Sequence, residues 1–145
     1  MIEIEVAVEI RQKPPVVFNF ITDLDKSSLW QSGMKESFSL SEEPMNVGSR
    51  YVQETSFLGQ RLRTTFEITV FKPGLEFSAQ SVEGPFPLHL TRSIEPCSSG
   101  SRLITRVQGD PGSYFKLPTF ILKKMVESAI KSDCISLQKQ LNERI

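Results

Sequence analysis

The sequence predicts an α+β fold in which an antiparallel sheet of about seven strands packs against a long C-terminal helix. Three patterns support this class. The N-terminal segment alternates apolar and acidic residues, the middle of the chain repeats short alternating segments between turn signals, and the C-terminal segment has helical periodicity. With 145 residues and no repeat or linker, the chain is expected to form one domain over 1–145.

The first elements follow from local signals. Residues 2–10, IEIEVAVEI, place apolar side chains on one face and glutamates on the other, as in a half-buried strand. Pro14 and Pro15 suit the first turn of a helix, and residues 26–31 predict a second short helix that Gly33 can end. Two short helices are therefore expected after the first strand.

The middle of the chain, from residue 34 to 109, returns to strand patterns. Short segments with Gly and Pro separate the alternating runs, so consecutive strands are expected to pair antiparallel as a meander. The expected strands are 35–42, 49–57, 60–72, 75–82, 86–96 and 102–109, with a turn at 97–101.

The C-terminal segment, from Pro118 to Ile145, has apolar residues three or four positions apart and charged residues on the opposite side. At ~1.5 Å per residue the predicted helix is roughly 40 Å long. Few small domains bury so long a helix except across the whole face of a sheet.

Composition excludes several functions. The 17 Lys and Arg residues balance the 17 Asp and Glu residues, so the chain has no net positive charge to attract DNA or RNA. We therefore expect that it does not bind nucleic acid. No apolar stretch approaches ~18 residues, so no stable membrane insertion is expected. A single histidine and two distant cysteines, Cys97 and Cys134, predict no metal site, and no cofactor is expected. Both cysteines are interpreted as free thiols, which suits the cytoplasm, and the acidic residues near the start argue against a signal peptide.

The order of elements resembles the SRPBCC superfamily, whose helix-grip fold includes START lipid-transfer domains, and more narrowly its polyketide cyclase/dehydrase-like group. The resemblance implies a curved sheet wrapped around the C-terminal helix, with an elongated apolar cavity between them for lipids, sterols, plant hormones or polyketides. It covers essentially the whole chain and rests on the segments PPVVFNFITDLDKSSLWQ, VGSRY, FLGQRLRTTFEITVFKPG, EGPFPLHLTRSIEP and GSRLITRVQGD, with the closing helix.

Several side chains are candidates for lining such a cavity, although a filled core explains the apolar ones equally well. Tyr51 and Gln53 could supply hydrogen bonds to a ligand. The loop 109–113 could gate the cavity. The candidate ligand-binding residues are Trp30, Tyr51, Gln53, Glu54, Phe66, Phe77, Leu90, Arg92, Phe115, Phe120 and Met125.

The segment 84–92, GPFPLHLTR, contains two polar candidates, His89 and Arg92, whose facing can be predicted from alternation. Alternation puts Leu90 and Arg92 on the face that meets the helix and turns His89 outward, which favours a surface histidine over a catalytic one. A buried arginine needs a partner, and Glu54 or an acidic ligand could provide it. The alternative is that Arg92 reaches solvent from the end of its strand.

Three functions stay open at this point. The first is binding of a small hydrophobic molecule, which is lipid-, sterol- or polyketide-like. The second is an enzyme of the polyketide cyclase/aromatase type that directs an aldol cyclisation or dehydration by shape. The third is a co-chaperone or protein-interaction module. The sequence also leaves open whether the chain forms a homodimer.

Overall fold

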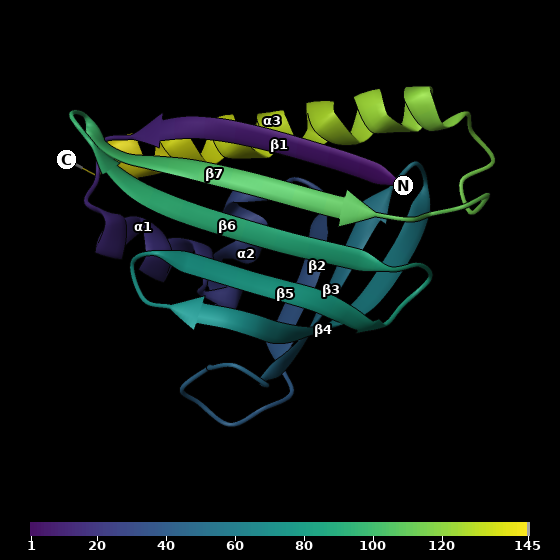
Figure 1. Ribbon diagram of the computed structural model, residues 1–145, viewed down its shortest axis with the longest axis horizontal. Helices are drawn as coiled ribbons and strands as arrows, with labels where there is room; N and C mark the ends of the chain where they lie inside the picture. The colour runs from purple at the N-terminus through teal and green to yellow at the C-terminus, as the bar shows by residue number, and fades with distance from the viewer. Residues whose placement is uncertain (145) are drawn as a thin grey trace.

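The alternating segments form one antiparallel sheet of seven strands in the computed structural model, which describes residues 1–144 (Figure 1). The strand order is β1-β7-β6-β5-β4-β3-β2, so the six strands from β2 to β7 form the expected meander and β1 pairs with the last of them. The strands are β1 (Ile2–Ile10), β2 (Met34–Ser39), β3 (Arg50–Phe57), β4 (Gln60–Lys72), β5 (Glu76–Glu83), β6 (Leu88–Cys97) and β7 (Gly100–Gly109).

The helices lie where the sequence predicts them. Helix α1 (Pro14–Ile21) begins with two prolines, which lack the amide hydrogens that a first turn leaves unbonded. A 3₁₀ turn, η1 (Leu24–Lys26), leads into the short α2 (Ser27–Trp30). The long α3 (Thr119–Asn142) runs along β1 (Figure 1). Ile145, which the sequence places on the apolar stripe of this helix, lies outside the described residues.

The sheet is strongly curved. Irregular pairing interrupts the ladders between β2 and β3 and between β4 and β5, and such bulges bend a strand and increase its twist. As a result β2 and β3 run at a steep angle to β6 and β7 (Figure 1). The curvature gives the sheet a concave inner face, which α3 covers together with the short helices. The α+β helix-grip arrangement is therefore confirmed.

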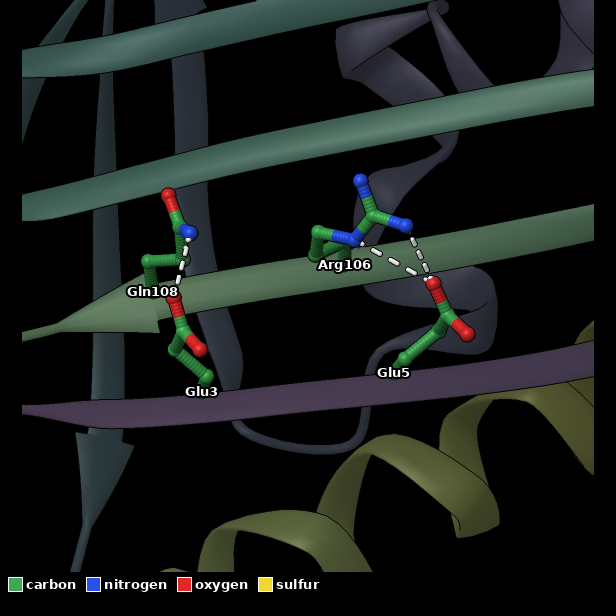
Figure 2. A network of polar contacts seen from close by, with 4 residues as sticks. All are labelled: Glu3, Glu5, Arg106 and Gln108. Atoms are coloured by element: carbon green, nitrogen blue, oxygen red, sulfur yellow. Dashed lines mark hydrogen bonds and ion pairs between the residues drawn. The ribbon is translucent and has the colours of Figure 1, made fainter.

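Strict alternation separates the two faces of β1 and β7. Ile2, Ile4 and Val6 are buried, whereas the glutamates between them are exposed. On the outer face Gln108 donates to Glu3 at 2.8 Å, and Arg106 donates to Glu5 (Figure 2). The polar pairs follow the register of the two strands, in which Glu3 is opposite Gln108 and Glu5 is opposite Arg106.

Two of the predicted boundaries are wrong. The expected turn at 97–101 is shorter, because Cys97 pairs with Gly100 and only two residues connect β6 to β7. A Cβ on Gly100 would lie 2.5 Å from the carbonyl oxygen of Ile10. Only glycine therefore allows the start of β7 to pass this close to the backbone at the end of β1. The strand expected at 35–42 ends at Ser39, whose hydroxyl bonds the backbone of Ser41 and turns the chain away.

The buried side chains form two clusters. The larger cluster joins α1, the sheet and the C-terminal half of α3, including Leu137 and Leu141. The smaller cluster joins β1 to α3 through Ile4, Val6, Leu122 and Cys134, and Val8 packs against both clusters. α3 therefore contacts the sheet along its length, with most of its buried residues toward its C-terminal end.

Candidate functional site

A cavity with two chambers lies between the inner face of the sheet and α3. We call the chamber of about 270 Å³ beside Phe115 the aromatic chamber, and the chamber of about 250 Å³ beside Arg92 the arginine chamber. The chambers are adjacent, because the same set of side chains lines both of them at their boundary. The shared residues are Gln31, Met34, Thr55, Leu62, Leu88, Val107, Ile130 and Asp133.

The aromatic chamber is walled by rings from the end of β3 and from two loops. Phe115 lies 5.5 Å from Phe57 and 5.6 Å from Phe86 between ring centroids, in edge-to-face geometry. Such pairs are favourable beyond the area they bury. Pro111, from the loop predicted as a gate, also lines this chamber. The loop between β7 and α3 therefore borders the cavity, as expected.

Arg92 lines the arginine chamber from β6. Its cross-strand partners Phe77 and Thr105 are both buried, which places Arg92 on the inner face. The guanidinium carbon lies 4.8 Å from the centre of the Trp30 ring, a cation–π contact. None of the ion pairs among residues 1–144 includes Arg92. Burial lowers its pKa, and the neighbouring Tyr51, Cys134 and Asp133 oppose that shift only in part.

Two buried nitrogen donors of the arginine chamber, Nε1 of Trp30 and Nε of Arg92, have no hydrogen-bond partner within the described chain. A third buried atom, Oγ1 of Thr105, has only the weakly bonding thiol of Cys134 beside it. All three belong to residues that line the chamber. Because buried polar groups are nearly always bonded, these atoms distinguish the chamber from a fully paired core.

Asp133 stands at the boundary of the chambers. Its carboxylate accepts hydrogen bonds from the backbone amide and the hydroxyl of Ser32, each at 3.1 Å. Burial raises the pKa of this carboxyl, while the bonds from Ser32 and the charge of Arg92 act in the opposite direction. The arrangement holds a half-buried carboxyl group near a buried guanidinium, both facing one apolar space.

The structure brings together six of the residues predicted from the sequence. Trp30, Gln53, Phe66, Leu90 and Arg92 line the arginine chamber, and Phe115 lines the aromatic chamber. Two others lie in the core beside the cavity, where neither lines a chamber. Tyr51 is fully buried and stacks on Phe66 at 5.3 Å, and Phe77 packs 6.2 Å from the same tyrosine. Burial raises the pKa of Tyr51, so this phenol stays protonated.

The prediction that Glu54 pairs with Arg92 is wrong. Gln53 and Thr55 point into the cavity, so alternation sends Glu54 to the outer face. There it pairs with two exposed arginines, Arg61 at 3.2 Å and Arg63 at 3.7 Å. The alternative in which Arg92 reaches solvent holds in part, because the residue is half-buried, with a buried Nε and its guanidinium over the ring of Trp30.

The positions of Phe120 and Met125 also differ from the prediction. The side chain of Phe120 is 67% exposed and that of Met125 is 38% exposed, and neither lines a chamber. The helix turns Leu122 and Val126 to the cavity instead. Periodicity identifies an apolar stripe, but both residues stand next to that stripe and only the packing shows which side faces inward.

His89 borders the arginine chamber, but its neighbours agree with the predicted outward facing. Its cross-strand partners are Gln80 and Gln108, and Gln108 lies on the outer face, where it bonds Glu3 (Figure 2). The imidazole therefore shares the face that carries the paired polar residues.

Sequence reasoning missed Asp133 and Thr105. Asp133 lies between Ile130 and Leu137 on the stripe that α3 turns inward, so a charge inside an apolar stripe was the available signal. Thr105 alternates with Leu103 and therefore faces inward. A threonine on an inner face is common in sheets, so nothing in the sequence distinguished it.

Neither a metal-ligand cluster nor a membrane-spanning helix is found among the described residues. Residues 1–144 contain no group of three or more His, Cys, Asp or Glu side chains arranged to hold a metal ion. Among the helices of that range, none combines the length and apolarity that crossing a bilayer requires.

Comparisons with known proteins identify the fold. A scan against protein-family models finds no match, and a search of curated proteins finds no relative. Among solved structures, a START superfamily protein from Mycobacterium smegmatis superposes with a TM-score of 0.84 at 13% identity, covering 99% of each chain. A protein from Thermus thermophilus gives 0.75 at 20% identity, over 98% of this chain and 95% of that one. Ara h 8.0201 gives 0.70 at 10% identity, over 97% of each chain. These likenesses, at nearly full coverage and low identity, show that the chain has a START-like helix-grip fold.

Proposed function

We propose that the protein binds a small hydrophobic molecule in the cavity between the sheet and α3. One observation supports this most: two adjacent chambers of about 270 Å³ and 250 Å³, each partly open to solvent, lie between the sheet and α3 of a small domain. Protein interiors normally pack to crystal-like density, so such space between the sheet and its covering helix is unusual. Burial of an apolar ligand there gains roughly 25 cal/mol per Å² of apolar area removed from water.

The lining supports the same proposal. Most side chains that line the aromatic chamber are apolar, and the rings of Phe57, Phe86 and Phe115 form one wall. Polar groups are few and gather at the other end, near Arg92. Apolar walls with a small number of placed polar groups are typical of sites that bind small molecules.

Native mass spectrometry of the purified protein tests the proposal. We expect a fraction of the protein to carry a bound molecule of a few hundred daltons, which denaturing extraction then releases for identification. A mass equal to the bare chain, together with no thermal shift across a library of lipids and aromatic compounds, would contradict the proposal.

A second candidate function is an enzyme of the polyketide cyclase/aromatase type. It is favoured by Asp133, a half-buried carboxyl of raised pKa that faces the cavity close to Arg92. A carboxylate there could remove a proton from a carbon between two carbonyl groups, while the guanidinium stabilises the enolate oxygen. The enolate carbon would then attack a second carbonyl carbon of the same chain, whose oxygen takes up the proton, and loss of water would follow.

Incubation with short β-polyketone thioesters tests this second function. A catalyst would release cyclised, dehydrated products faster than buffer, and Asp133→Asn would abolish the gain. A carrier would bind the same compounds without changing the products.

A further inference from the structure

The unpaired polar groups of the arginine chamber are mainly donors. The indole Nε1 of Trp30 and the Nε of Arg92 carry hydrogens and have no lone pair to offer. Nearby groups bond elsewhere: Oδ1 of Asp133 accepts two hydrogen bonds from Ser32, and the Gln53 amide donates to Ser37. Neither Trp30 Nε1 nor Arg92 Nε is bonded by these groups, so both donors lack an acceptor.

Charge points in the same direction. Arg92 is half-buried over Trp30 with a buried Nε, and none of the ion pairs among residues 1–144 includes it. An arginine keeps its charge under nearly all conditions, and removing a charge from water without a close partner is costly. The charge of Asp133 acts on Arg92 from beyond ion-pair distance and offsets this cost only in part. An anion paired directly with the guanidinium would offset it further.

The position of these groups defines the orientation of the ligand. The donors lie in the arginine chamber, whereas the aromatic chamber beyond the shared boundary offers rings and aliphatic side chains. A ligand that satisfies both chambers has an acidic head at Arg92 and an apolar body that extends toward Phe115.

We propose that the ligand is an amphiphilic carboxylic acid whose carboxylate accepts hydrogen bonds from Arg92 and Trp30 and whose apolar body fills the aromatic chamber. This inference rests on the proposed function, since it names the class of molecule that the same cavity binds. An alcohol of the same shape leaves the guanidinium without a counter-ion, and an amine adds a second positive charge beside it.

A fluorescence titration tests the head group. The single tryptophan of the chain, Trp30, lies in the wall of the arginine chamber, so its emission reports occupancy directly. The probes are decanoate, 1-decanol and decylamine, which share one tail and differ in the head. We expect decanoate to bind at least tenfold more tightly than decanol, and decylamine to bind most weakly.

Two variants sharpen the titration. Arg92→Met removes the charge and the donors but keeps an unbranched, flexible side chain, and it should reduce the preference for decanoate over decanol to less than twofold. Arg106→Met, on the outer face of the next strand, is the matched control and should keep the full preference. Circular dichroism verifies that each variant is folded, and Arg92→Gln replaces Arg92→Met if the latter fails to fold.

The outcomes separate the two proposals. Equal affinity for decanoate and decanol in the wild-type protein would overturn the carboxylate inference and leave the hydrophobic site intact. A preference that survives Arg92→Met would also overturn it, because the charge would then play no part. If none of the probes, nor a naphthalene carboxylate and naphthol pair, changes the emission of Trp30, both proposals fail.

Discussion

Arg92 and Arg106 occupy opposite faces of neighbouring strands and have opposite surroundings. Arg106 is about half exposed and donates to Glu5 on β1, within a row of polar contacts that water also reaches (Figure 2). Arg92 is half-buried, lies over Trp30 and has an unpaired Nε. The polar groups drawn on the outer face are thus paired with one another, whereas the inner face keeps donors without a partner in the described chain. The difference teaches that polar pairing and apolar packing do not coincide on the inner face, where unpaired donors cost stability.

The largest contrast between the two faces is expected in packing. Leu103 is fully buried on the inner side of β7, and Arg102 beside it is exposed and 3.7 Å from Glu95. Leu103→Ala should lower the free energy of unfolding by about 2–5 kcal/mol, because it removes apolar contacts and leaves a cavity. Arg102→Ala should cost about 0–1 kcal/mol, as for an exposed ion pair. Urea denaturation measures both, and equal losses would contradict a core confined to the inner face.

The second contrast is that replacing the two arginines should change the free energy of unfolding in opposite directions. Arg92→Met should raise the free energy of unfolding of the ligand-free protein by about 1–3 kcal/mol, since it removes a buried charge that has no ionic partner. Arg106→Met should lower it by about 0–1 kcal/mol through loss of the pair with Glu5. Thermal and urea denaturation of the delipidated proteins measure the two effects. A loss of stability in Arg92→Met would show that the contact with Trp30 outweighs the cost of burial.

Two threonines provide a matched pair of smaller effects. The hydroxyl of Thr105 faces inward without a bonded partner, whereas that of Thr91 accepts from Ser78 at 3.1 Å. Thr105→Val should leave stability unchanged or raise it by up to about 1 kcal/mol, and Thr91→Val should lower it by about 1 kcal/mol. The comparison fails if both substitutions have the same sign in urea denaturation.

The smallest expected effect is one of pH. Burial raises the pKa of Asp133 in the folded chain above its ordinary value of 3.8. The folded state then holds this proton more tightly than the unfolded state, so the contribution to stability is present below pH 3.8 and is lost as pH rises through the raised pKa. Asp133→Asn keeps an acceptor for Ser32 but does not titrate. Its stability relative to the wild type should therefore increase between about pH 4 and about pH 7 in urea denaturation, and a constant difference would contradict the shift.

Most of the fold could be predicted from the sequence, because each element carries its own local signal. Alternation identified β1, the prolines marked the start of α1, and glycines marked the turns of the meander. Alternation also gave the facing of Arg92 and its neighbours on β6 correctly. These properties depend on residues close together in the chain.

The partners of the candidate site were harder to predict, since they depend on contacts between distant elements. The cation–π contact of Arg92 with Trp30 requires α2 to lie under β6, and no local pattern encodes it. The sequence offers Glu54 as an ionic partner for Arg92, because both are charged residues within apolar strand patterns. In the structure, the ionic partners of Glu54 are instead Arg61 and Arg63 on β4. Pairing across a curved sheet depends on register and curvature, which bulges alter.

The uneven burial along α3 has a consequence for motion. The C-terminal half of the helix carries the buried Cys134, Leu137 and Leu141, whereas the buried residue of its N-terminal half is Leu122, beside the aromatic chamber. Local opening costs least where few buried contacts must be broken. We therefore expect amide hydrogens near Leu122 to exchange with deuterium faster than those near Leu141, so that the helix opens from its N-terminal end, over the aromatic chamber.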